Sequence, residues 1–598
     1  MATGLATTLL HTPSSSFRSS QTFPMILKTP TPQEETLCLS ALDQNTVRVY
    51  TQVFLIFPFP DKNQAGIAIQ ALQRGLHATL GSFPFLAGNL SLADDESGKL
   101  VLTYPTEVPD LKQSGLFASN FKSSFEAYEK LKKEGMPPSA FPGSKFRPDD
   151  FANYPGIPSD GEGIVDFSNG NQAPAMRVQA DFIPGGLVLS TYVHHAVMDC
   201  KGINIFWKCF AGNISDTMPE DRVMSMPGRK WFPFASQHWL TLAAPDYVLN
   251  QLTMRQRVNE RAPTFARGQV PPAEAYVDGA FKYQKHLPDD TQCSLKYFLI
   301  SAARIRGYRD HLKQYFPDTS PPTICNVLAA LLWIHVTRAR AFRRGNCGHE
   351  MTNIGIATDL RTRMDPPPPL EDTYTGNMAI FSKGTLRVQD IIADNVVTEK
   401  TIVHTIKEVR DTISKVDNEW VSRHLGFFKA IDKITDTECG LAFRFGMDIY
   451  ITSWMNFGAD LQWGIPGTDL NAESLGGRPE FIRRSYGPSD GGMMIMPRRR
   501  HTANGEEAPY EVMVRLATVD MERLLAEEGG DCPLGLNALS SELSSGTTAA
   551  TGRQRNEDHV VAWHGAPWPI CIHKVWSSAP VYVLGLGTNI SFGKRLGI

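Results

Sequence analysis

The stretch that decides the fold reads Leu187-Val-Leu-Ser-Thr-Tyr-Val-His-His-Ala-Val-Met-Asp-Cys-Lys-Gly202. Its apolar, β-branched first half predicts a buried strand, and a helix is expected to begin after Gly202. Neighbouring residues of a strand point to opposite faces, so one of His194 and His195 can face a cleft while the other packs inward. For the same reason the two rings cannot easily hold one ion. No further histidine or carboxylate lies at ligand spacing nearby, and we expect no metal site.

The spacing His195-Ala-Val-Met-Asp199 carries little information by itself. A chain with 15 histidines contains a second copy, His286-Leu-Pro-Asp-Asp290, which lies in a polar, proline-containing stretch and is interpreted as a solvated turn. The first copy differs because an apolar strand precedes it. A pair of satisfied core histidines is the alternative interpretation of His194 and His195, and the residues alone leave it open.

At 598 residues the chain is too long for one hydrophobic core, because cores stop growing near ~250–300 residues. Strand patterns alternate with helical patterns in both halves, which predicts α/β layers. We predict a disordered lead-in, an N-terminal domain with the histidine motif, a crossover, a C-terminal domain, and a flexible linker with an unassigned tail. These parts span residues 1–36, 37–240, 241–292, 293–528 and 529–598. The lead-in resembles a transit peptide in its Ser/Thr content, but its prolines and few basic residues favour disorder.

Periodicity and turn residues place the individual elements. Strands are expected at residues 47–59, 175–182, 186–194, 294–300, 353–358 and 510–516. Helices are expected at residues 64–80, after 202, and at 324–340, 388–416 and 520–528. Residues 137–163, rich in Pro, Gly and Asp, are expected to form a surface loop.

Composition narrows the class of protein. A net charge of −3 gives no whole-protein sign of nucleic-acid binding, although Arg498, Arg499 and Arg500 form a local basic patch. Nine cysteines are scattered without a Cys-x-x-Cys pair, which indicates neither a disulfide scaffold nor a zinc module and fits the cytoplasm. Apolar runs of about 18 residues are missing from the sequence, so no membrane-spanning segment is expected.

Together with its surroundings, the motif resembles the His-His-x-x-x-Asp-Gly signature of the BAHD-type acyl-CoA-dependent acyltransferases. The chain is similar to the fungal branch typified by trichothecene 3-O-acetyltransferase, from about Leu39 to Glu528. Besides the motif, the landmarks that carry the resemblance are Leu39-Ser-Ala-Leu-Asp-Gln44, Phe83-Pro-Phe-Leu-Ala-Gly-Asn-Leu90, Phe125-Glu-Ala-Tyr-Glu129, Leu331-Leu-Trp333, Asp359-Leu-Arg-Thr-Arg363, Tyr374-Thr-Gly-Asn377, Thr452-Ser-Trp454 and Asp460-Leu-Gln-Trp-Gly464.

The resemblance implies two similar chloramphenicol-acetyltransferase-like domains, each a mixed sheet with helices, and an active-site tunnel at their interface. It implies acetyl-CoA as the co-substrate and no bound cofactor. The acceptor is expected to be a hydroxyl (or amine) of a secondary metabolite such as a trichothecene or other terpenoid, an alkaloid or a polyketide. Related enzymes act as monomers, without nucleic-acid or membrane partners.

The resemblance also assigns roles to residues. His195 matches the catalytic base, which removes the proton of an alcohol whose own pKa is far above 7. Asp199 matches a structural aspartate of the catalytic motif, for which Arg361 is the expected partner. Thr452 and Trp454 match positions that line the acceptor site, and the Trp454 indole is a candidate oxyanion donor. Gly202, Asp460 and Gly464 match structural positions.

Two departures separate the chain from the family pattern. Cys200 stands where the family has glycine, and a β-carbon there costs about 1 kcal/mol if the position needs positive φ. Leu461 and Gln462 replace Phe and Gly in the second motif. These changes indicate a divergent or a decayed enzyme, and the intact base and flanking strand favour an active one. Two alternatives to a coenzyme A-dependent enzyme stay open. One is a condensation-type enzyme that takes acyl groups from carrier proteins; the other is a catalytically silent binding protein of the same fold.

Overall fold

The computed structural model describes residues 34–216, 251, 254–265, 269–270, 272–278, 292–344, 350–364, 374–394, 396–434, 437–439, 441, 446–468, 477–484, 490–499, 507–527 and 537–538. The lead-in up to residue 33, the tail beyond 538, Arg500 and the copy at His286–Asp290 lie outside these residues. The chain divides into a unit of residues 1–541 and a second unit of residues 542–598 that lies wholly outside them.

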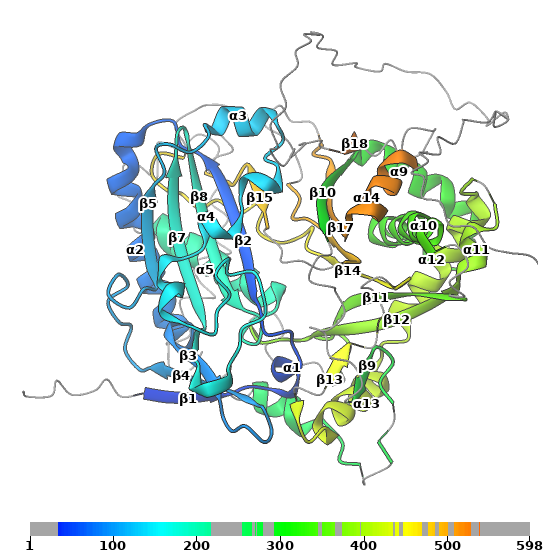
Figure 1. Ribbon diagram of the computed structural model, residues 1–598, viewed down its shortest axis with the longest axis horizontal. Coiled ribbons are helices and arrows are strands. Elements are labelled where there is room, and N and C mark those ends of the chain that lie inside the picture. The colour runs from blue at the N-terminus through cyan, green and yellow to red at the C-terminus, as the bar shows by residue number, and fades with distance from the viewer. Residues whose placement is uncertain are drawn as a thin grey trace, which may run out of the picture. The chain divides into compact units, whose positions relative to one another are not determined.

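The first sheet carries the histidine motif and is mixed (Figure 1). In order across the sheet its strands are β15 (Phe481–Arg483), β2 (Tyr50–Pro58), β8 (Gly186–His194), β7 (Met176–Ile183) and β5 (Phe117–Phe121). The β5–β7 pair is parallel and the other pairs are antiparallel. β2 and β8 are buried along nearly their whole length, because both of their faces are covered, and this explains their unbroken apolar sequences.

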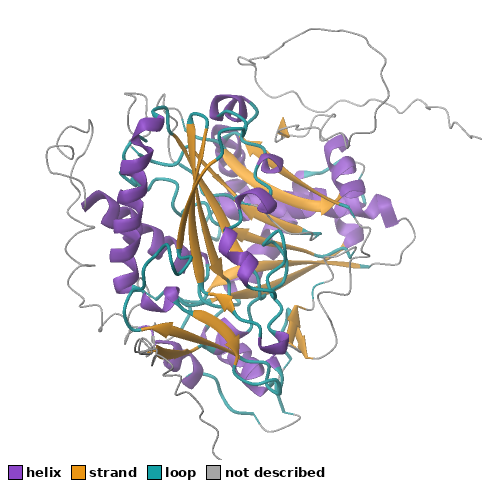
Figure 2. Cartoon of the chain, turned by 60° about the vertical axis from the view of Figure 1, so that its left-hand side comes forward, coloured by secondary structure: helices purple, strands orange, loops and turns teal. Residues whose placement is uncertain are grey.

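One face of this sheet is covered by helices. Figure 2 shows helices beside its strands, and they are α2 (Ala65–Ser82) and α5 (Cys200–Asp216). On α5, the indole of Trp207 donates a hydrogen bond of 3.3 Å to Thr191 of β8, which fixes the helix on this face. The helix that was predicted to begin after Gly202 begins slightly earlier, at Cys200.

Residues 137–163 cover the opposite face, so the expectation of a surface loop is wrong. The segment contains α4 (Gly143–Phe146) and short 3₁₀ turns, and its Phe141, Phe146 and Phe151 are at most 1% exposed. Phe146 and Phe141 pack on Phe54 of β2. Proline, glycine and aspartate shape the backbone of this segment, but its phenylalanines decide where it lies.

A small sheet flanks the first one. Its strands, in order, are β1 (Glu34–Cys38), β4 (Leu100–Pro105), β3 (Asn89–Leu92) and β6 (Ala173–Pro174). β1 pairs with β4 from Glu34 onward, inside the part of the chain predicted to be a disordered lead-in. The short helices near these sheets are α1 (Ala41–Gln44) and α3 (Tyr128–Lys133).

The second large sheet is also mixed and belongs to the second half of the chain. Its strands, in order, are β12 (Ala379–Arg387), β11 (Met351–Asp359), β14 (Ile449–Ser453), β16 (Gly492–Ile495), β17 (Tyr510–Ala517), β10 (Cys293–Ile300) and β18 (Asn537–Ala538). Its helices are α9 (Ala302–Leu312), α10 (Ile324–Arg344), α11 (Val388–Ile392), α12 (Glu399–Ser414) and α14 (Thr518–Glu527). The predicted fold class, mixed sheets with helices in both halves, is confirmed.

Two expectations for the second half are corrected. The single helix predicted at residues 388–416 is two helices, because Thr398 caps a new N-terminus by accepting a hydrogen bond from the backbone of Thr401. The crossover is not wholly irregular, since β9 (Tyr276–Asp278) pairs with β13 (Thr437–Cys439) next to α13 (Asn418–Ala430).

Strand β15 links the two halves of the chain. It comes late in the sequence, yet it pairs with β2 of the first sheet, with Arg483 opposite Phe54. Trp463 and Ile465, which precede it, are fully buried in the first hydrophobic core. The predicted C-terminal domain at 293–528 thus contributes a strand and core residues to the N-terminal sheet.

Candidate active site

The two histidines stand where β8 ends. His194 is the last residue of the strand and lies opposite Tyr50 of β2, while His195 donates its backbone N–H to the carbonyl of Val49 at 2.8 Å. The His194 side chain is 0% exposed and makes edge contacts with the rings of Tyr50 and Phe167. His195 is only partly buried. His194 is therefore the more deeply buried of the two residues.

Burial lowers the pKa of His195 below its usual value, and the positive charge of Arg484 acts in the same direction. Contacts with its own backbone, the charge of Asp199 and the side chain of Asn377 act in the opposite direction without cancelling the burial. The imidazole is therefore neutral near pH 7. A neutral ring is the form that can accept a proton.

His194 is a different kind of group. Its Nδ1 accepts a hydrogen bond from the backbone N–H of Ala196 at 3.2 Å, which holds the ring neutral. Burial, followed by the charges of His195 and Arg48, lowers the pKa of His194 to about 3. His194 is thus a core histidine, whereas His195 is less deeply buried.

His194 is expected to make the protein sensitive to acid. Its pKa falls from 6.5 to about 3 on folding, so the unfolded chain binds the extra proton and stability declines as the pH drops through this range. The loss is about 1.4 kcal/mol per pH unit. His194→Asn cannot titrate and keeps an acceptor for the Ala196 N–H, so its unfolding free energy should lack this slope. Chemical denaturation of both proteins between pH 4 and 7 measures the difference.

The difference between the two proteins, not the wild-type profile, is the informative quantity. Burial raises the pKa of Asp181 to about 6. The contribution of this carboxyl to the stability of the protein is therefore lost in the opposite direction, as the pH rises from 3.8 through 6. Asp181 is present in both proteins, and its contribution cancels in the comparison. Parallel profiles for wild type and His194→Asn would contradict a buried neutral His194.

Asp199 anchors the turn after the strand. Arg361, just after β11, pairs with it in a bidentate arrangement, with Nη1 at 2.9 Å from Oδ2 and Nη2 at 3.0 Å from Oδ1. The carboxylate also accepts the backbone N–H groups of Gly202 and Met378 at 2.9 and 3.0 Å. The expected pair is present. Because these four bonds occupy the carboxylate, Asp199 positions the backbone between His195 and α5.

Gly202 is required for a close backbone approach. A β-carbon at this position would lie 2.1 Å from the carbonyl oxygen of Thr375, a distance that a side chain cannot occupy. The concern about Cys200 is removed, since the non-glycine residues with positive φ in the described part of the chain are Met136 and Asn169. Burial raises the pKa of the Cys200 thiol well above its ordinary value, which makes it a poor nucleophile.

Three residues near the backbone of His195, Asn377, Asp43 and Arg255, were not predicted as site residues. Asn377 donates from Nδ2 to the carbonyl of His195 at 2.8 Å and to Oδ1 of Asp43 at 2.9 Å. Asp43, on α1, also pairs with Arg255 at 3.1 Å. Both Asp43 and Asn377 stand in quoted landmarks, which was the available signal, whereas nothing in the sequence marked Arg255. This network ties the backbone of His195 to three separate segments of the chain.

The remaining predicted residues lie in and after β14. Thr452 is in the strand, and Trp454 follows it with 5% of its surface exposed. Gly464 has φ of +60°, and a β-carbon there would lie 2.8 Å from Oγ of Ser215 at the end of α5. Asp460 is exposed and its carbonyl accepts from Arg478 at 3.1 Å. Gly464 therefore belongs to the packing, whereas the side chain of Asp460 is at the surface.

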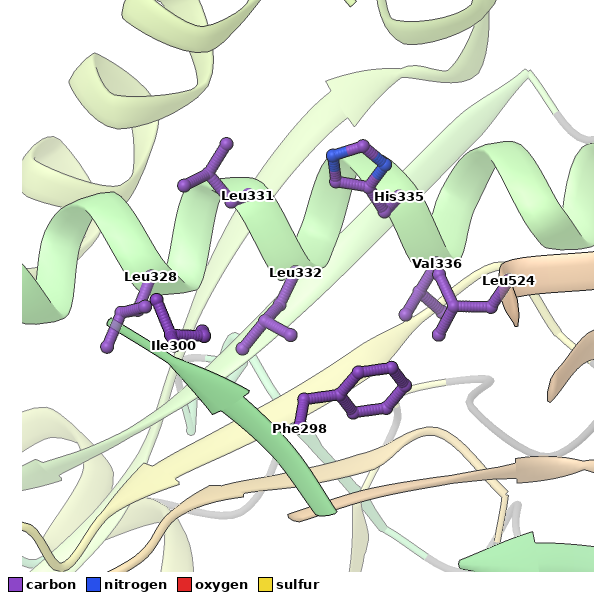
Figure 3. Close-up of a pocket in the computed structure, with 8 residues that line it drawn as sticks. All are labelled: Phe298, Ile300, Leu328, Leu331, Leu332, His335, Val336 and Leu524. Carbon is purple, nitrogen blue, oxygen red and sulfur yellow. The ribbon is translucent and has the colours of Figure 1, made fainter. Parts of the chain in front are cut away.

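An apolar pocket lies elsewhere, inside the second half (Figure 3). Its lining comes from β10, α10 and α14: Phe298, Ile300, Leu328, Leu331, Leu332, His335, Val336 and Leu524. These are mostly residues of the second hydrophobic core, so the pocket is a packing feature of that core. It is not the predicted tunnel to His195, which stays a prediction.

Within the described residues, no cluster of three or more His, Cys, Asp or Glu side chains is arranged to hold a metal ion. Nor does any helix in that part of the chain have both the length and the apolar character needed to cross a bilayer.

Comparison with known proteins assigns the family. Residues 49–211 match the trichothecene 3-O-acetyltransferase-like N-terminal domain, and residues 165–528, more than half of the chain, match the Transferase family. Trichothecene 8-O-acetyltransferase of Fusarium sporotrichioides is 23% identical, with 83% of this chain and 97% of that protein covered. Acyltransferase easC of Emericella nidulans is also 23% identical, with 83% and 94% covered.

A solved structure shares the fold. TRI101 of Fusarium graminearum, in a crystal structure with coenzyme A and deoxynivalenol, superimposes with a TM-score of 0.61 at 17% identity, covering 85% of this chain and 100% of that one. From the matched domains and the arrangement of the sheets, the chain belongs to the Transferase family and is an acyltransferase with an N-terminal domain of the trichothecene 3-O-acetyltransferase-like type.

Proposed function

We propose that this acyltransferase moves an acyl group, acetyl first, from coenzyme A to a hydroxyl of a secondary metabolite such as a terpenoid, with His195 as the general base. One observation carries the proposal. His195 carries a neutral imidazole at the end of β8, where its backbone is held by hydrogen bonds to the carbonyl of Val49 and from the side chain of Asn377.

The reaction needs only one proton carrier. Nε2 of His195 accepts the acceptor's hydroxyl proton as that oxygen attacks the thioester carbon, and the carbonyl electrons move to the oxygen. When the carbonyl re-forms, the carbon–sulfur bond breaks, and the protonated ring returns its proton to the leaving thiolate. No acyl-enzyme is required, in accord with the elevated pKa of the Cys200 thiol.

Donor and acceptor classes rest on similarity. Matched relatives are named as acetyltransferases of trichothecenes and of an eremophilane, and a structure that shares the fold was solved with coenzyme A and deoxynivalenol. Thr452 and Trp454 are the proposed lining of the acceptor site, with the Trp454 indole as the oxyanion donor. The proposed enzyme is a monomer of the cytoplasm, and the scattered cysteines support the reducing compartment.

A donor competition tests the proposal. The purified chain is incubated with a panel of hydroxylated terpenoids and either free acetyl-CoA or an acetylated, pantetheinylated carrier protein. We expect acceptor-dependent thiol release and an acetylated product, detected by mass spectrometry, with free acetyl-CoA. Product from the carrier-bound donor alone would identify a condensation-type enzyme. Calorimetric binding of coenzyme A without turnover would identify a catalytically silent binding protein.

A further inference from the structure

The backbone of His195 is bonded on both sides of its α-carbon. Its N–H donates to the carbonyl of Val49, the residue before β2, at 2.8 Å. Its carbonyl accepts a hydrogen bond of 2.8 Å from Nδ2 of Asn377, a side chain from the second half of the chain. Because each peptide unit is planar, bonds to the two flanking units set the direction in which the side chain of His195 leaves the backbone.

The amide of Asn377 has one possible orientation. Besides the carbonyl of His195, Nδ2 donates to Oδ1 of Asp43 at 2.9 Å, so both amide protons are used. A carbonyl oxygen and a carboxylate oxygen only accept hydrogen bonds, and the amide oxygen therefore cannot take the place of the nitrogen. The backbone N–H of Asn377 also donates to Oδ1 of Asp43, at 2.8 Å, and the residue is 1% exposed. Asp43 thus holds Asn377 by its main chain and by its side chain.

Asp43 is a fully buried carboxylate at which donors from distant parts of the chain meet. Its Oδ2 accepts hydrogen bonds from the N–H and Oγ of Ser40 at 2.9 and 2.8 Å, and from Nε of Arg255 at 3.1 Å. Nη2 of Arg255 donates in turn to the carbonyl of Val197 at 3.0 Å. One carboxylate therefore orients the donors to two carbonyls of the turn after β8, those of His195 and Val197.

We propose that Asn377 is a positioning residue of the acyl transfer: it fixes the carbonyl of His195, and through it the ring, where the ring takes the acceptor's proton, while Asp43 holds the amide for this task. The inference rests on the proposed function of His195. Proton transfer requires a base within hydrogen-bond reach of the acceptor hydroxyl. A displacement of about 1 Å in a reacting group lowers a rate by about 100-fold. Without Asn377, the peptide unit after His195 loses a hydrogen bond on its carbonyl side.

Asn377→Leu removes both amide protons and keeps a side chain of similar size. Its kcat is expected to fall about 10–100-fold, because the base is displaced from the acceptor. The KM for acetyl-CoA should change by less than about twofold, since the variant alters the position of the base and not a contact with the coenzyme. Thiol release from acetyl-CoA with the best acceptor of the terpenoid panel measures both constants.

A second measurement follows the ring itself and needs no substrate. Protein carrying ¹³C-labelled histidine gives a ring signal for His195 in the NMR spectrum, assigned by its absence in His195→Gln. We expect one narrow signal in the wild type. In Asn377→Leu the signal should be broadened or split by exchange between ring positions on the microsecond-to-millisecond timescale. If Asn377→Leu does not fold, Asn377→Ala, which keeps the backbone bond to Asp43, should show the same loss of kcat and the same change of the signal.

Ser40→Ala is the matched control. Ser40 is fully buried and donates through Oγ to the same carboxylate, but to Oδ2, whereas Asn377 bonds to Oδ1. Its Oγ also accepts from the backbone N–H of Asp43 at 3.1 Å, as the N-cap of α1. Loss of this cap should lower the melting temperature. Both kcat and the His195 signal should stay as in the wild type.

Three results would overturn the inference. Wild-type kcat in a folded Asn377 variant would show that the chemistry does not need this bond. Loss of kcat with a wild-type His195 signal would show that Asn377 does not act through the ring. Equal losses of kcat in Asn377→Leu and Ser40→Ala would indicate a general packing effect. Failure of the proposed function looks different: His195→Ala would keep its turnover, or no acceptor would be acetylated, while the NMR comparison would still report whether Asn377 holds the ring.

Discussion

His195→Ala is expected to lower kcat by about 10²–10⁴-fold while the protein remains folded. The variant removes the imidazole that accepts the hydroxyl proton, and among the described residues the other histidine at the end of β8, His194, has its ring packed against Tyr50 and Phe167. The backbone bonds of residue 195 to Val49 and Asn377 do not involve the side chain and should persist. Steady-state thiol release with acetyl-CoA measures the loss.

Two further histidine variants show whether the loss is specific. His77→Ala removes an exposed ring of α2 and should leave kcat unchanged. His194→Asn disturbs the neighbouring residue and should lower stability more than kcat. If His195→Ala retained more than about a tenth of wild-type kcat with an unchanged melting curve, proton transfer by this ring would be ruled out as the main contribution to catalysis.

Asp199→Asn is expected to reduce the unfolding free energy by about 3–5 kcal/mol, the second large effect. The substitution leaves the guanidinium of Arg361, which is 1% exposed, with only the half-exposed carboxylate of Asp359, at 3.1 Å, as a counter-charge. The cost is therefore mainly that of a poorly compensated buried cation. Turnover should fall as well, because the carboxylate fixes the turn between His195 and α5, so folding and chemistry suffer together.

A double-mutant cycle separates the pair from its surroundings. Asp199→Asn with Arg361→Gln removes both charges, and the double variant should be less destabilised than the sum of the single ones. Chemical denaturation gives the four free energies of unfolding, for the wild type, the two single variants and the double variant, and kcat is measured on the same samples. Additive losses of stability would contradict a direct buried ion pair. Loss of kcat with full wild-type stability in Asp199→Asn would instead assign the aspartate to the chemistry.

Many features of the site depend on residues that are close together in the sequence, and these features were therefore predictable. The strand 186–194 was predicted with the bounds of β8, and the inward packing of one histidine of the pair agrees with the alternation of side chains along it. Residues 137–163 were predicted wrongly because composition does not show which surface their phenylalanines will pack against. The single helix at 388–416 was predicted wrongly because periodicity does not show that Thr398 caps the start of a new helix.

By itself, then, the sequence determined a mixed α/β chain with a histidine displayed at the end of a buried strand, since strand periodicity and turn residues act over a few neighbours. Only the tertiary structure decided that Asn377 meets Asp43 across 334 positions, and that β15 joins the first sheet to bring Arg484 against Trp454. Asp199 and Arg361, 162 positions apart, were paired beforehand by resemblance alone. Such contacts depend on how whole sheets pack, and no local pattern encodes that.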